Sequence, residues 1–209
     1  DAVADPRLEV FDGGSVQTAE NDDWRAGDAE QFARLGAFSL PPGSADAALI
    51  VDLPPGPGTA HAWATGGGVV LVEIYDPAAA TRSKIVNLSA RALVGPGEQL
   101  MIGGFNVSGT GDKRLLIRAM GPQLAAFGVE NPLADPELVL HGSGGAQLAA
   151  NDNWHPDIAW SFDAAGAAAL PAGSRDAAVV VTLTAGDTYT VIVRSANGAT
   201  GEALLEIYE

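Results

Sequence analysis

The sequence predicts an all-β protein built from two tandem antiparallel β-sandwich modules, of which the N-terminal one is incomplete. Three observations support this prediction. The chain contains an internal repeat, its short apolar runs recur roughly every 8–12 residues between turn-forming residues, and only the second copy of the repeat is preceded by a strand-rich stretch. A hydrophobic fraction of 47% agrees with a packed globular protein.

The repeat is the strongest of these observations. Residues 4–56 align with residues 134–186 at a constant offset of 130, without a gap, and nearly half of the aligned positions are identical. After a length difference of a few residues, the ends of the two copies also match. The most similar pairs of segments are Asn21–Trp24 with Asn151–Trp154, Leu40–Ala48 with Leu170–Ala178, and Leu71–Tyr75 with Leu204–Tyr208. Such similarity indicates a duplicated structural unit.

The two copies differ in what precedes them. A strand-rich stretch, residues 85–129, comes before the second copy, whereas the first copy has no counterpart of it. We therefore expect a truncated β-sandwich at 1–76, a short linker at 77–81 and a complete β-sandwich at 82–209.

Each expected element follows from local sequence. Apolar runs with alternating polarity, bounded by Gly, Pro, Asn and Asp, predict strands at 8–11, 48–53, 69–75, 85–94, 99–107, 114–120, 177–183, 188–194 and 203–208. The alanine-rich segment 156–165 predicts a short helix or an irregular loop, and 26–35 takes the same place in the first copy. The segment 123–127 after Gly-Pro predicts one helical turn. Acidic residues in the first turn of the segment 26–35 favour a helix N-terminus.

Several motifs together resemble a known family. The pattern Asp-Pro-x-Leu, Asn-Asp-x-Trp, Leu-Pro-x-Gly and Glu-Ile-Tyr resembles the bacterial pre-peptidase C-terminal type of β-sandwich. The segments Asn87–Gly95, Ile102–Phe105 and Leu116–Pro122 are similar to a repeat of large secreted and cell-surface proteins of environmental bacteria. The resemblance implies an extracellular β-module without catalysis, and some related sandwiches bind calcium.

Charge and composition exclude several functions. The chain has 11 basic and 26 acidic residues, a net charge of −15, so binding to nucleic-acid phosphates is not expected. It has no cysteine, which excludes disulfides and thiolate sites. No apolar stretch is long enough for a transmembrane segment, and the first residues do not form a signal peptide. We expect a secreted or cell-surface bacterial protein.

No motif points to an enzyme. The three histidines, His61, His141 and His155, have no sequence signature that supplies a partner nucleophile or base. Serine-hydrolase, zinc-protease and phosphate-loop patterns are also missing from the sequence. We therefore predict that the protein is not an enzyme.

Acidic turns in both copies suggest a calcium site. Calcium prefers six to eight oxygen ligands from carboxylates, amides and carbonyls. The alternative is that these Asn and Asp side chains only cap turns by bonding to nearby backbone N–H groups. The candidate ligands are Asp5, Asp12, Asn21, Asp22 and Asp23 in the first copy, and Asp135, Asn151 and Asp152 in the second.

Two tryptophans are candidates for contact with a ligand. Trp24 and Trp154 occupy matching repeat positions, so we expect them to pack inside the fold. Trp63 and Trp160 have no tryptophan counterpart, and an exposed aromatic side chain at either position would suit a polysaccharide or a neighbouring subunit.

Basic residues gather in the middle stretch, whereas the rest of the chain is acidic. Arg91, Lys113, Arg114 and Arg118 could guide packing of this stretch against an acidic half of another subunit. The alternative is ordinary surface charge.

The incomplete first module suggests a function. A half sandwich leaves strand edges and an apolar face unpaired, and strand addition from another chain would cover both. The leading hypothesis is a structural subunit of an extracellular or cell-surface assembly, such as a filament, made of copies of this chain. The alternative is a non-catalytic, calcium-dependent carbohydrate-binding or adhesive module. A third interpretation lets the middle stretch serve both modules within one chain.

Overall fold

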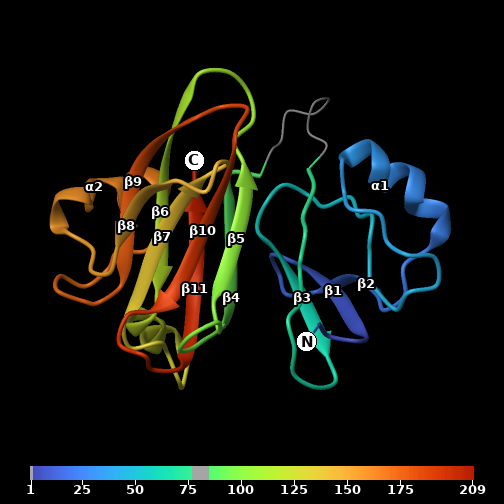
Figure 1. Cartoon of the computed structure of the whole chain (residues 1–209), viewed down its shortest axis with the longest axis horizontal. Coiled ribbons are helices and arrows are strands. Elements are labelled where there is room, and N and C mark those ends of the chain that lie inside the picture. The colour runs from blue at the N-terminus through green and yellow to red at the C-terminus, as the bar shows by residue number, and fades with distance from the viewer. Residues whose placement is uncertain (1, 77–84) are drawn as a thin grey trace. The chain divides into compact units, whose positions relative to one another are not determined.

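The computed structural model describes residues 2–76 and 85–209 (Figure 1). The chain divides into two compact units, Asp1–Lys84 and Ile85–Glu209. The second unit is built mainly from antiparallel strands, and the first contains one antiparallel sheet, which confirms the all-β fold class. The linker expected at 77–81 lies outside the described residues.

The second unit is a complete β-sandwich of two four-stranded sheets, with strand orders β5-β10-β7-β8 and β4-β11-β6-β9. A large core of apolar side chains from both sheets fills the space between them. The strands are β4 (Asn87–Val94), β5 (Met101–Asn106), β6 (Asp112–Met120), β7 (Pro136–Gly142), β8 (Gln147–Asn151), β9 (Ala177–Thr184), β10 (Thr188–Ser195) and β11 (Gly201–Tyr208).

Strand β6 is the central element of the second unit. It pairs with β11 on one side and with β9 on the other, and its last six residues are all buried. Leu115, Ile117 and Ala119 enter the core between the sheets. Leu116 and Met120, on the opposite face of the strand, enter a second apolar cluster. The buried run Leu115–Met120 is therefore apolar except for Arg118, because neither face of β6 meets solvent.

The first unit contains one three-stranded sheet of order β2-β1-β3, with β1 at Pro6–Asp12, β2 at Gln17–Asn21 and β3 at Gly58–Ala64. It corresponds to β8-β7-β10 of the second unit. The β1–β2 and β7–β8 pairs share the same register and the same irregularity, between Val10 and Phe11 and between Leu140 and His141. Among residues 2–76, only Val10 and Phe32 are buried apolar side chains, so this unit is the incomplete module.

Both units contain the same helical corner, a short 3-10 turn followed by a short α-helix. The first unit has η1 (Ala26–Asp28) and α1 (Ala29–Leu35), and the second has η4 (Pro156–Ile158) and α2 (Trp160–Ala165). A left-handed glycine ends each helix, at Gly36 and Gly166. The tryptophan before each corner donates its indole N–H to a proline carbonyl, Trp24 to Pro41 at 3.2 Å and Trp154 to Pro171 at 3.1 Å. A further 3-10 helix, η3 (Pro122–Phe127), follows β6.

Two strand predictions were wrong. Residues 48–53 and 69–75 do not form strands, although β9 and β11 do form at the equivalent places in the second unit. A strand needs a neighbour to receive its backbone hydrogen bonds. In the second unit β6 is that neighbour for both β9 and β11, and no strand takes its place among residues 2–76.

The middle stretch of the chain serves the second unit. Strand β4 pairs with β11, β5 pairs with β10, and β6 pairs with β11 and β9. These pairings do not support the interpretation in which this stretch completes both modules.

Because Ile117 of β6 is fully buried and Ile102 of β5 is 63% exposed, the two residues form a matched pair for a stability test. We expect Ile117→Ala to lower the free energy of unfolding of the second unit by about 2–5 kcal/mol, because it leaves a cavity in the core. Ile102→Ala should lower it by less than about 1 kcal/mol. Urea denaturation, monitored by hydrogen exchange at β9 and β11, measures the loss of unfolding free energy in both variants. Equal losses would contradict the central role of β6.

Candidate strand-acceptor site of the first unit

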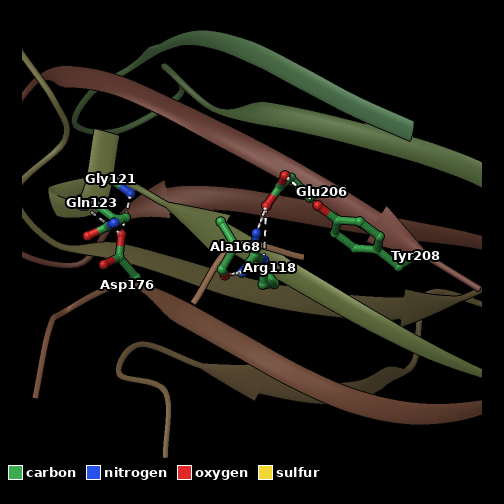
Figure 2. A network of polar contacts seen from close by, with 7 residues as sticks. All are labelled: Arg118, Gly121, Gln123, Ala168, Asp176, Glu206 and Tyr208. Atoms are coloured by element: carbon green, nitrogen blue, oxygen red, sulfur yellow. Dashed lines mark hydrogen bonds and ion pairs between the residues drawn. The ribbon is translucent and has the colours of Figure 1, made fainter. Parts of the chain in front are cut away.

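In the second unit, polar contacts join β6 to the elements packed around it (Figure 2). The Arg118 side chain is only 1% exposed. It donates from both Nε, at 2.9 Å, and Nη2 to the Glu206 carboxylate, and from Nη1 to the carbonyl of Ala168. Its guanidinium carbon lies 5.2 Å from the ring centre of Phe162 and 5.6 Å from that of Tyr208. We call Phe162, the Ala168 carbonyl, Glu206 and Tyr208 the arginine cage.

Neighbouring groups complete this network. The Tyr208 hydroxyl donates to Glu206 at 2.7 Å. Burial, followed by this hydrogen bond to a carboxylate, raises the pKa of Tyr208 above its usual value. At the end of β6, Oδ1 of the buried Asp176 accepts hydrogen bonds from the backbone N–H groups of Gly121 at 2.8 Å and Gln123 at 3.2 Å. The cage therefore fixes the middle of β6, and Asp176 fixes its end.

The first unit repeats the residues of this network without the strand. Phe32, Glu73, Tyr75 and Asp46 occupy the repeat positions of Phe162, Glu206, Tyr208 and Asp176. The Tyr75 hydroxyl donates to Glu73 at 3.0 Å, and burial followed by this bond raises the pKa of Tyr75. No residue among 2–76 corresponds to Arg118, because the first copy of the repeat does not include a β6.

The two segments that would flank such a strand are residues 47–53 and 69–75, which we call the acceptor segments. Both are held at their first residues as β9 and β11 are. The amide of Ala48 donates to Asn21 Oδ1 at 3.0 Å, as Ala178 does to Asn151 at 2.9 Å. These bonds fix the start of residues 47–53 in the first unit and the start of β9 in the second.

The start of the second acceptor segment, residues 69–75, is held by the same kind of bond as the start of β11. Val3 donates its backbone N–H to the carbonyl of Val69 at 3.1 Å, and Leu133 does the same to Glu202 at 2.7 Å. The acceptor segments therefore begin where β9 and β11 begin, and among residues 2–76 no strand pairs with them as β6 pairs with β9 and β11.

The apolar side chains of the acceptor segments face solvent. Their counterparts in β9 and β11 are buried by β6 and by the opposite sheet. The exposed fractions are 47% for Leu53 against 5% for Leu183, 46% for Val72 against 3% for Leu205, and 53% for Ile74 against 8% for Ile207. This exposed surface is of the kind that marks an interaction site.

The amide residues predicted as calcium ligands have structural partners. The Nδ2 group of Asn21 donates to the Asp23 carbonyl at 2.7 Å, and that of Asn151 donates to the Asn153 carbonyl at 2.8 Å. Asp12 Oδ1 accepts from the amides of Gly14 and Val16 and so closes the β1–β2 turn.

The predicted acidic ligands are spread between surface and interior. Asp135 is 8% exposed and pairs with Arg175 at 2.6 Å. Asp5, Asp22, Asp23 and Asp152 are exposed. Among the residues that the structure describes, no three His, Asp or Glu side chains lie close enough together to hold a metal ion. The calcium site stays a prediction.

The two candidate contact tryptophans are both exposed, Trp63 by 54% and Trp160 by 53%. Trp63 donates its indole N–H to Glu9 at 2.8 Å, and its ring meets that of His61 edge-on at 5.6 Å. The guanidinium of Arg114 lies 5.8 Å from the ring centre of Trp160.

Arg118 is the residue whose role sequence reasoning missed. Grouping it with Arg91, Lys113 and Arg114 treated it as surface charge or as a contact between subunits, whereas the structure buries it. Its position within the apolar run Leu115–Met120 was the available signal, because a cation inside a strand buried on both faces needs a buried anion.

The matched carboxylates Glu206 and Glu73 test the difference between a unit with a buried arginine and a unit without one. Replacing Glu206 by Gln leaves Arg118 buried without its counter-charge, and we expect a loss of about 3–5 kcal/mol in the free energy of unfolding of the second unit. Glu73→Gln, the matched change in the first unit, should alter stability by less than about 0.5 kcal/mol, because no strand carries an arginine to this side chain. Chemical denaturation of the full chain measures both, and a large effect of Glu73→Gln would contradict this comparison.

In comparisons with known proteins, no family model and no curated protein matches the chain. None of the helices that the structure describes is long and apolar enough to cross a bilayer. Among solved structures, the chain is similar to the pre-peptidase C-terminal domain of a collagenase from Bacillus anthracis, with 14% identity and a TM-score of 0.37. The match covers 58% of this chain and 89% of that domain.

Proposed function

We propose that the protein is a non-catalytic structural subunit of an extracellular or cell-surface assembly, such as a filament, in which β-strands are donated between subunits. The acceptor segments carry this proposal. They are anchored like β9 and β11, they expose their apolar side chains, and they lack the strand that β6 supplies in the second unit.

Physical chemistry favours donation of a strand at this place. A strand entering between residues 47–53 and 69–75 would satisfy backbone groups on both of its sides and cover apolar side chains of both segments. If each subunit donates at one end and accepts at the other, the contact is heterologous, and such contacts build open fibres when they do not close into rings. Other copies of the same protein are the partners in this proposal.

The state of association tests the proposal. We expect the chain to form oligomers at micromolar concentration in light scattering and electron microscopy, with slowed hydrogen exchange at the acceptor segments on assembly. Val72→Asp should weaken association, because it places a charge in the acceptor surface. The control is Val16→Asp, at an exposed position of the β1–β2 turn, which should have no effect. A stable monomer with fast exchange at both segments would count against strand donation.

A second candidate function is carbohydrate binding. Phe11, His61 and Trp63 form a row of rings on one face of the β1–β3 pair, with centroid distances of 4.9 Å and 5.6 Å. Glu9 accepts the Trp63 indole N–H beside this row. Exposed rings next to a carboxylate suit stacking against a sugar with hydrogen bonding at its edge.

Calorimetry against a panel of polysaccharides, with and without a calcium chelator, tests this second candidate. Trp63→Ala should lower affinity at least tenfold, whereas Trp160→Ala, an exposed tryptophan of the other unit, should leave it unchanged. Chelator sensitivity would support a calcium-dependent site. Absence of binding across the panel would exclude the candidate.

A further inference from the structure

We infer that the acceptor segments form a slot selective for one kind of strand, which carries an arginine opposite Glu73, apolar residues on both faces and a glycine at its end. This inference rests on the proposed strand donation and specifies the partner that the slot receives.

Charge complementarity selects the arginine. The first unit keeps the three side chains whose counterparts surround Arg118, namely Phe32, Glu73 and Tyr75. Among the described residues, Glu73 contacts the Tyr75 hydroxyl and no cation. A strand with a neutral residue at this place would bury the Glu73 carboxylate without a counter-charge, which is costly. An arginine offers the donors that satisfy it, as Arg118 does for Glu206.

The corner of the first unit requires a strand that is apolar on both faces. In the second unit Leu116 and Met120 of β6 help to cover the Trp154 ring, which is 7% exposed. The equivalent Trp24 is only partly buried, although it still packs against Phe32 at 6.2 Å. A donor therefore needs apolar residues that point to the corner on one face and to the sheet β2-β1-β3 on the other.

The end of the strand is selected by steric contact. A Cβ atom at Gly121 would lie 2.1 Å from the carbonyl oxygen of Leu133, so only glycine fits there. Val3 occupies the repeat position of Leu133, and Asp46 occupies that of Asp176, which receives the Gly121 amide. The same two requirements, a small residue and a free backbone N–H, therefore apply to the strand that enters the first unit.

A synthetic peptide of residues 108–124 provides a probe for the slot in the full chain. We expect saturable binding by fluorescence anisotropy, with hydrogen-exchange protection appearing at residues 47–53 and 69–75. Arg118→Gln in the peptide, or Glu73→Gln in the chain, should weaken binding at least about tenfold. The two changes together should weaken it little more than either alone. Gly121→Val in the peptide should also weaken binding.

The matched control is Arg114→Gln in the peptide, because Arg114 is exposed in β6 and this change removes the same charge without affecting the cage. Its affinity should equal that of the parent peptide. Equal weakening by Arg114→Gln and Arg118→Gln would overturn the arginine selectivity, as would protection appearing at β9 and β11 instead of the acceptor segments.

The experiment separates this inference from the proposed function. If the chain assembles and protects the acceptor segments, but peptide binding ignores Arg118 and Glu73, strand donation stands and the selectivity is wrong. If the chain neither assembles nor binds the peptide, both are wrong. Assembly of the chain together with peptide binding in the expected pattern supports both.

Discussion

One strand buried on both faces is the constraint on which the second unit depends. β6 joins β9 to β11, supplies apolar side chains to two separate cores, and carries a cation into the interior. A buried arginine is tolerated because every charge-bearing part of it has a partner: the Glu206 carboxylate, the Ala168 carbonyl and two aromatic rings. Such a strand is difficult to replace by any other sequence, because its composition, charge and end are all fixed by its neighbours.

Among residues 2–76 of the first unit, no strand of the β6 type lies beside the segments that correspond to β9 and β11. Residues 47–53 and 69–75 have sequences close to those of β9 and β11, yet they remain outside any sheet. Their β-branched residues favour strands, but this preference is weaker than the need of backbone groups for a partner. The helical corner, by contrast, forms in both units, because its hydrogen bonds join residues close together in sequence.

The sequence was sufficient for the features that depend on local pattern and on the repeat. The helices at 26–35 and 156–165, the turn after Pro122, and strands β1, β4, β5, β6, β9, β10 and β11 follow from it. The polar strands β2 and β8 were missed, because Gln17–Asn21 and Gln147–Asn151 contain few of the residues that usually mark a strand. Strands β3 and β7 were also missed.

The acceptor segments were predicted as strands for a physical reason that also explains the error. Alternating apolar residues record which face a segment would bury, not whether a partner is present to bury it. The arginine cage could not be assembled from sequence alone, because Arg118, Phe162 and Glu206 come from elements far apart in the chain. Only the pairing of β6 with β11 brings the arginine and its carboxylate together.

The anchors of the acceptor segments give the slot a direction. Both Ala48 and Val69 are fixed at the end of the segments that corresponds to the carboxyl-terminal half of β6, from Arg118 onward, while the far ends have no such bonds among the described residues. The entropy cost of closing the first contact is lowest where the chain is already immobile. An incoming strand would therefore form its first contacts at its carboxyl end and then pair toward its amino end. Its last residues would control the rate of docking.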